Sequence, residues 1–143
     1  MSHVGRAVRR REDPPLLRGA GRFLDDLRLE GLAHVVFVRS PHAHARIQAS
    51  DLEAARKAPG VLAVVSAAEL DPFPALGTLR PIEGMVRPPM PFLAADVVRA
   101  QGSPVAVVVA ASAALAADAA ALAWLDYAAL PGVAEADASL AAG

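Results

Sequence analysis

A continuous apolar stretch from Val105 to Leu125 constrains the fold of this 143-residue chain more than any other feature. It is long enough to raise the question of a membrane span, which needs about 20 apolar residues. Asp118 lies inside the stretch, and the composition changes midway from β-branched valine to alanine and leucine. We therefore predict a buried strand over Val105–Val109 and a helix over Ala113–Ala123.

Ser112 lies where the predicted strand meets the predicted helix. Its hydroxyl can accept a hydrogen bond from a first-turn N–H, so Ser112 is the expected N-cap. We expect the valine strand to be the central one. On that basis Val107→Asp would place an unpaired charge in the core and unfold the chain.

Three other segments have the pattern of short strands. His34–Val38 and Val61–Val65 are compact apolar runs, which are typical of strands buried on both faces. Trp124–Ala128 is a further short strand near the end of the chain.

A half-buried strand is predicted over Ala43–Ser50. Apolar and polar residues alternate there, which puts Ala45, Ile47 and Ala49 on one face.

Two helices shorter than the alanine-rich one are also expected. Leu52–Ala58 follows Asp51, a capping residue, and Pro59-Gly60 ends it. Ser66 and Glu69 have the spacing of a capping box, and prolines soon after limit that helix to one turn. Strands and helices interleave, so we predict an α+β fold with a mixed sheet and two main helices.

Six of the 12 prolines lie between residues 71 and 91, and this segment is predicted to be a long loop that meets a partner surface. The length of the chain fits one domain over residues 1–143, with a core at about 16–130 and an N-terminal arm at 1–15.

Charge and cysteine content exclude several classes of function. The formal net charge is -1, which is a poor basis for a general nucleic-acid binder. With no cysteine, the chain cannot form a disulfide, a thiolate nucleophile or a cysteine-bound iron–sulfur cluster. Arg9–Arg11 is followed by acids and prolines rather than by the apolar stretch of an export signal, so we expect a cytoplasmic protein without membrane partners.

His42 and His44 form the most suggestive pair of side chains. Residues two apart share one face of a strand, so both imidazoles could reach one metal ion. A stable metal site needs further ligands, and no acid lies at a diagnostic spacing. Paired histidines at a strand end more often pack and form hydrogen bonds. Among functional interpretations, the nearby Arg39, Ser40 and Arg46 favour contact with an anion or a subunit interface over a metal site.

Two other motifs have structural interpretations. Asp25-Asp26 is predicted to be a turn in which one carboxylate accepts from backbone N–H groups. Gly19-x-Gly21 lacks the preceding strand and following helix of a phosphate-binding loop. No catalytic set emerges from the residues.

Several blocks, in order along the chain, resemble the molybdopterin-binding large subunit of the xanthine dehydrogenase and aldehyde oxidase family, which includes aerobic carbon monoxide dehydrogenase. The blocks are Val8–Leu27, Phe37–Ile47, Pro59–Val65, Asp96–Arg99, Pro104–Ala110, Ala117–Ala120, Asp126-Tyr127 and Leu130-Pro131. The resemblance covers nearly the whole chain.

This resemblance implies the α/β hammerhead domain, the N-terminal module of that subunit. In the family, domains that follow it hold the molybdenum cofactor (molybdopterin) and the glutamate base, and iron–sulfur and FAD subunits are its partners. No catalytic, cofactor-binding or metal residue carries over to this chain. In the family an aromatic residue and a glutamate are usual where this chain has Ala100 and Ser103.

Our first hypothesis is therefore a structural and assembly domain of a molybdenum hydroxylase, which is not expected to be catalytic alone. Its expected interface residues are Arg39, His42, His44, Arg46, Gln101 and Ser103. The alternatives are a free-standing small-molecule or metal-binding module, or a gene fragment without function.

Overall fold

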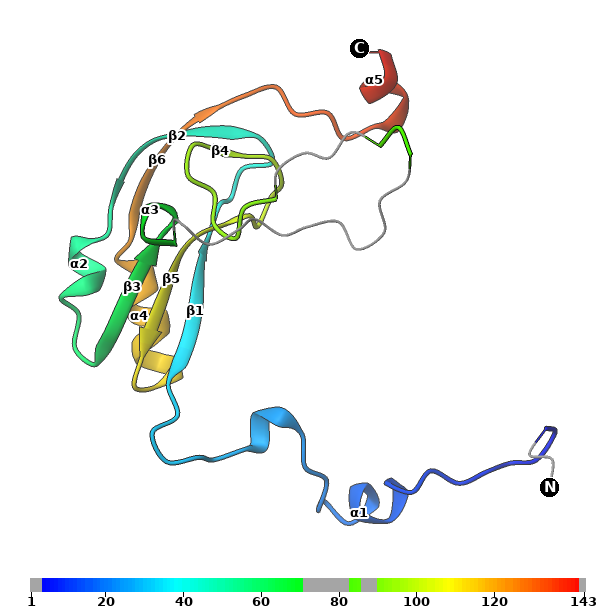
Figure 1. Ribbon diagram of the computed structural model, residues 1–143. Helices are drawn as coiled ribbons and strands as arrows, with labels where there is room; N and C mark the ends of the chain where they lie inside the picture. Colours follow the sequence, from blue (N-terminus) through cyan, green and yellow to red (C-terminus); the bar gives the residue numbers. More distant parts are fainter. Residues whose placement is uncertain (1–3, 71–82, 86–89, 142–143) are drawn as a thin grey trace. The chain divides into compact units, whose positions relative to one another are not determined.

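The valine run forms β5 (Pro104–Ala110), the middle strand of a three-stranded antiparallel sheet. In this computed structural model, which describes residues 4–70, 83–85 and 90–141, β1 (His34–Arg39) and β3 (Val61–Ser66) pair with its two edges (Figure 1). The predicted central position of the valine strand is confirmed.

The two faces of this sheet differ in burial. Along β5, Val108 and Ala110 are fully buried and Ala106 nearly so, whereas Val107 and Val109 are partly exposed. The expectation that an aspartate at position 107 would enter the core is therefore wrong. The strand is where the sequence predicts it, but Val107 faces away from the core.

The outer strands follow the same alternation. Val35 and Phe37 of β1 are 52% and 44% exposed, and Leu62 of β3 is 63% exposed. The prediction that these two apolar runs are buried on both faces is wrong. Val64 belongs to the core cluster and Val38 packs against it, whereas the residues that alternate with them are at least partly exposed.

Helix α4 (Ala113–Ala121) covers the buried face of this sheet. Ala116 and Ala119 are fully buried, and their small side chains let the helix backbone approach the strands closely. The Oγ of Ser112 accepts a hydrogen bond from the N–H of Leu115 at 3.3 Å, so the predicted N-cap is confirmed.

The other predicted main helix is a single turn, α2 (Glu53–Arg56). The carboxylate of Asp51 accepts from the N–H of Glu53 at 2.9 Å, but the helical turns end before Lys57. Among the helices of the described residues only α4 is long, so the prediction of two main helices is wrong. The one-turn helix expected after Ser66 is present as α3 (Ala67–Leu70).

A second three-stranded sheet consists of β2 (Ala45–Asp51) between β4 (Val97–Val98) and β6 (Trp124–Ala129). Its strands are antiparallel, as are those of the first sheet. The α+β class is confirmed and the mixed sheet is wrong. Apolar periodicity locates a strand, but it does not specify the neighbour or its direction.

A bulge at Gln48 interrupts the alternation predicted for β2. Ile47 lies opposite Tyr127 and packs on the core of this sheet, whereas Ala49 lies opposite the exposed Asp126. The prediction that Ala49 shares the face of Ile47 is wrong, because one extra residue reverses the order of the faces.

The chain divides into two compact units, Met1–Leu32 and Ala33–Gly143. The first contains α1 (Asp13–Leu17) and the 3-10 turn η1 (Leu24–Asp26); the second also contains α5 (Ala136–Ala141). The Asp26 carboxylate accepts from the Phe23 N–H at 2.9 Å, as predicted for this turn.

Most of the predicted proline-rich loop, residues 71–91, lies outside the described residues, and the predicted domain boundaries stay predictions. None of the helices in the described part of the chain is long and apolar enough to span a membrane.

Candidate interface at the junction of the two sheets

Ser40 lies at the end of β1 and is 2% exposed. Its N–H donates to the carbonyl of Ser103 and its own carbonyl accepts from the N–H of Gly102, both at 2.9 Å. Its Oγ accepts from the His42 N–H at 3.1 Å. These bonds bring together the two segments, 39–46 and 101–103, that contain all the predicted interface residues.

Arg39, an exposed residue, also holds the two segments of this junction together. Its Nη1 donates to the carbonyl of Gly102 at 2.8 Å, and its guanidinium carbon lies 5.1 Å from the centre of the Phe37 ring. A guanidinium stacked on an aromatic ring and bonded to a carbonyl is pre-organised, and it can still donate to another acceptor.

The two histidines do not share a strand face, since both precede β2. The His42 ring packs on the ring of Tyr127, with centroids 5.0 Å apart and an angle of 54°. The Nδ1 of His44 lies 2.6 Å from the carbonyl oxygen of Pro131, which can only accept, so Nδ1 carries the proton. The two imidazoles have different partners, and within the described ranges no three His, Asp or Glu side chains could hold a metal.

Tyr127 contacts the core of the second sheet, and its hydroxyl is buried. Burial raises the pKa of this hydroxyl, and the nearby Ser40 side chain opposes that shift. Within the part of the chain that is described, the hydroxyl has no partner with the geometry of a hydrogen bond. Tyr127 therefore supports the junction mainly through its ring.

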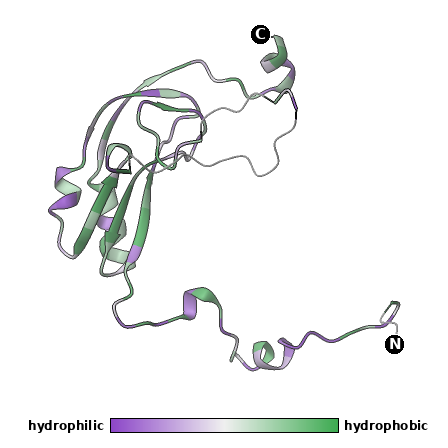
Figure 2. Ribbon diagram, in the orientation of Figure 1, coloured by the Kyte–Doolittle hydropathy of each residue, from purple (hydrophilic) through white to green (hydrophobic). Residues whose placement is uncertain are grey.

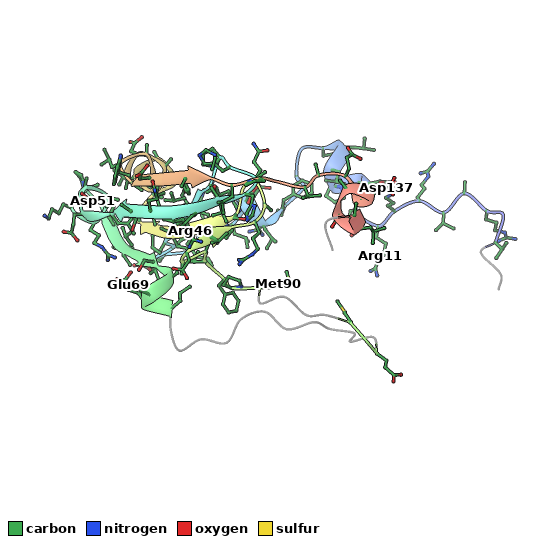
Figure 3. The ribbon with its side chains drawn as sticks, turned by 90° about the horizontal axis from the view of Figure 1, so that it is seen from above. Arg11, Arg46, Asp51, Glu69, Met90 and Asp137 are labelled. Carbon is green, nitrogen blue, oxygen red and sulfur yellow. The ribbon has the colours of Figure 1, made fainter. Side chains whose placement is uncertain are left out.

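The remaining predicted residues border the junction. Arg46 and Gln101 are exposed, and the Arg46 side chain projects from β2 (Figure 3). The Oγ of Ser103 donates to the carbonyl of Ala100 at 2.7 Å, which closes the turn before β5. The junction thus presents two arginines and several backbone-locked turns, an arrangement suited to binding a protein surface.

A shallow groove of about 600 Å³ lies beside His44. Arg99, Ala100 and residues 131–134 line it together with Ala43. Ala100 contributes only a methyl group to the lining. Sequence reasoning did not include Arg99 in the interface, because an isolated arginine in a turn-rich segment has no distinctive pattern.

Within the described residues, two antiparallel sheets, one of them backed by α4 and the short α2, define an α+β domain of the hammerhead type. Residues 18–131 match the family described as aldehyde oxidase and xanthine dehydrogenase, a/b hammerhead domain. The chain belongs to this family, and the resemblance inferred from the sequence blocks is confirmed.

Comparison with known proteins supports this assignment. The chain is 44% identical over 124 residues to the nicotine 6-hydroxylase large subunit of Paenarthrobacter nicotinovorans, and 41% identical over 128 residues to the carbon monoxide dehydrogenase large chain of Afipia carboxidovorans. These matches cover 86% and 90% of this chain but only 15% of each relative.

Solved structures agree with the sequence matches. Quinoline 2-oxidoreductase from Pseudomonas putida 86 superposes with a TM-score of 0.86 at 43% identity, over 95% of this chain and 17% of that one. The match is to the N-terminal part of large subunits of molybdenum hydroxylases, which are multisubunit proteins. The chain spans about one sixth of the length of these relatives.

Proposed function

We propose that this chain is a structural and assembly domain of a molybdenum hydroxylase large subunit. The observation that carries the proposal is the extent of the match: nearly all of this chain corresponds to one sixth of a much longer subunit. The remainder of such a subunit would hold the molybdenum cofactor, and iron–sulfur and FAD subunits would complete the complex.

The described residues offer no set of side chains that could ligate a metal ion directly. They contain no cysteine, and the described part of the chain has no cluster of three His, Asp or Glu side chains near a common point. In this proposal the oxidation of a substrate belongs to the remainder of the subunit.

In this proposal the junction of the two sheets contacts the remainder of the subunit. The residues that would make the contact are Arg39, His42, His44, Arg46, Gln101 and Ser103. Support comes from the hydrogen bonds around Ser40, which hold both segments rigidly before any partner binds. A pre-organised surface loses little conformational entropy on binding.

Reassembly from two polypeptides tests the proposal. The nicotine 6-hydroxylase large subunit, without its own hammerhead segment, is co-expressed with a tagged copy of this chain. That enzyme's own hammerhead segment, supplied separately, is the positive control. We expect the truncated subunit to co-purify with this chain and to bind molybdenum as it does in the control. Association in the control without association of this chain would refute the proposal.

A further inference from the structure

The first sheet, formed by β1, β5 and β3, has an apolar face that the described residues of Ala33–Gly143 cover only in part. Val38 and Val108 point into the core beneath α4. Val35 and Phe37 alternate with the buried residues of β1, so they point to the other side and are about half exposed. Figure 2 shows these strands coloured hydrophobic over most of their length.

Strand pairing arranges this face in two rows. Val109 lies opposite Val35 on one side and Ala63 on the other, and Val107 lies opposite Phe37 and Val65. Directly opposite residues project from the same face of a sheet. We call these six side chains the open face: Val35, Phe37, Ala63, Val65, Val107 and Val109.

All six side chains of the open face are apolar, and the one charged residue that continues the exposed side of β1 is Arg39 at its end. An antiparallel sheet with one face in water normally carries polar residues on that face, so that apolar and polar positions alternate. Here both faces are apolar, and contiguous exposed apolar surface is unfavourable in water. The composition is that of a sheet that is covered on both sides in the functional assembly.

We propose that the open face is the docking surface for the remainder of the molybdenum hydroxylase large subunit. This inference rests on the proposed function, and it adds a second contact surface to the junction around Ser40. More than four fifths of each relative's chain lies outside the match, so the subunit contains ample surface to cover the sheet.

The chemistry of the open face defines the partner surface. Aliphatic and aromatic side chains of the partner would lie over the two rows. Arg39 stands at one end, with its guanidinium over the Phe37 ring and one hydrogen bond to Gly102. A partner carbonyl or carboxylate would accept from Arg39 there, which would set the direction in which the two surfaces meet.

Substitutions on the open face test the inference in the same reassembly experiment. Phe37→Asp and Val107→Asp place a charge on this face without entering the core beneath α4. Trp124→Asp is the matched control, because Trp124 is an aromatic residue that is 57% exposed on a strand of the other sheet. We expect the two open-face variants to recover at least tenfold less truncated subunit than the wild-type chain, and Trp124→Asp to recover as much.

The accessibility of a single introduced thiol measures whether the open face is covered, and it does not require a substitution that weakens association. The chain has no cysteine, so Phe37→Cys and Trp124→Cys each introduce one thiol. We expect association with the truncated subunit to slow maleimide labelling at position 37 at least tenfold and to leave labelling at position 124 unchanged. This test remains decisive if either aspartate variant fails to fold.

The outcomes separate this inference from the proposed function. If the wild-type chain associates but position 37 stays accessible, the open face is not the docking surface and the proposed function stands. If the relative's own segment associates and this chain does not, the proposed function fails and this inference fails with it. If position 37 is protected only by dimerisation of the free chain, measured by sedimentation, the occupant is a second copy and the inference is wrong.

Discussion

The Nη2 of Arg56 lies 2.9 Å from both carboxylate oxygens of Glu69, which joins α2 to α3 beside the end of β3. The Nη1 of the same arginine donates to the carbonyl of Val64 at 2.7 Å. Glu69, which projects from α3 (Figure 3), also accepts from the N–H and the hydroxyl of Ser66 at 2.7 Å each. One ion pair therefore connects two helical turns to the edge strand of the first sheet.

This ion pair makes stability depend on pH. The hydrogen bonds that Arg56 donates to the Glu69 carboxylate lower the pKa of Glu69 from 4.5 to about 2, and the hydrogen bond from the Ser66 N–H acts in the same direction. A carboxylate with a lowered folded-state pKa adds stability above the unfolded pKa, and that stability is lost as the pH falls from about 5 to 2. Both side chains are partly exposed, so we expect Glu69→Gln to lower the free energy of unfolding by about 1 kcal/mol at most at pH 7.

Urea denaturation at several pH values checks this prediction. The difference between wild type and Glu69→Gln should shrink towards pH 2. Glu53→Gln is a control for a weaker contact with the same arginine, because Glu53 lies 3.7 Å from Arg56 and 3.4 Å from the exposed Lys57 and should change stability little. A difference that is independent of pH would show that the charge of Glu69 is not its cause.

Adjacent residues of β5 should respond in opposite ways to the same substitution. Val108→Asp puts an unpaired charge in a fully buried position, which costs several kcal/mol against a total stability of roughly 5–15 kcal/mol, so this variant should not fold. Val107→Asp should melt cooperatively, because its side chain can reach solvent. Circular dichroism melts distinguish the two, and an unfolded Val107→Asp chain would show that the open face is covered within the isolated chain.

Substitution of Gly60 should destabilise the chain for two reasons that can be measured separately. Its φ is +72°, and an added Cβ would lie 2.5 Å from the Cδ1 of Leu115 on α4. We expect Gly60→Ala to destabilise the chain by about 2 kcal/mol, with about 1 kcal/mol arising from the backbone. Gly102→Ala is the control, because its φ is +81° with open space around the Cβ. Equal losses in the two variants would mean that the contact with Leu115 contributes nothing.

The cap of α4 can be measured at Ser112. Ser112→Ala removes the oxygen that accepts from the Leu115 N–H and should lower the free energy of unfolding by about 1 kcal/mol. Ser112→Asp keeps an acceptor and should retain most of the stability. If chemical denaturation shows that the alanine and aspartate variants are equally destabilised, capping is not the cause.

Tyr127→Phe should be neutral or stabilising. The change removes a buried hydroxyl that has no hydrogen-bond partner within the described residues, and it leaves the ring against His42 in place. We expect the melting temperature to stay the same or to rise. A fall would reveal a hydrogen bond to the Ser40 hydroxyl in solution.

At the capping box of Ser66, the sequence predicts a contact between near neighbours but not the contact with a distant residue. The spacing predicts that Glu69 accepts from the Ser66 N–H, and it does. The same pattern predicts that the Ser66 hydroxyl accepts from the backbone, but this hydroxyl donates to Glu69 instead. Arg56, ten positions before Ser66, could not be foreseen as the main partner of Glu69, since only the turn between α2 and β3 brings it close.

The predicted interface also combines residues that are neighbours in the sequence with residues that only the fold brings together. Segments 39–46 and 101–103 lie far apart in the sequence, and the hydrogen bonds of Ser40 place them side by side. The pairing of His42 with His44 rested on a strand that begins only at Ala45. Without the strand, the two rings have no common face.

By itself, the sequence determined where strands and helical turns lie, because alternation, capping and proline breaks act between residues that are neighbours along the chain. Tertiary structure decided which strands pair, which face of each strand is covered and which carboxylate meets which arginine. Those outcomes depend on contacts between distant segments, and a single extra residue such as Gln48 in β2 reverses the face of the residues that follow it.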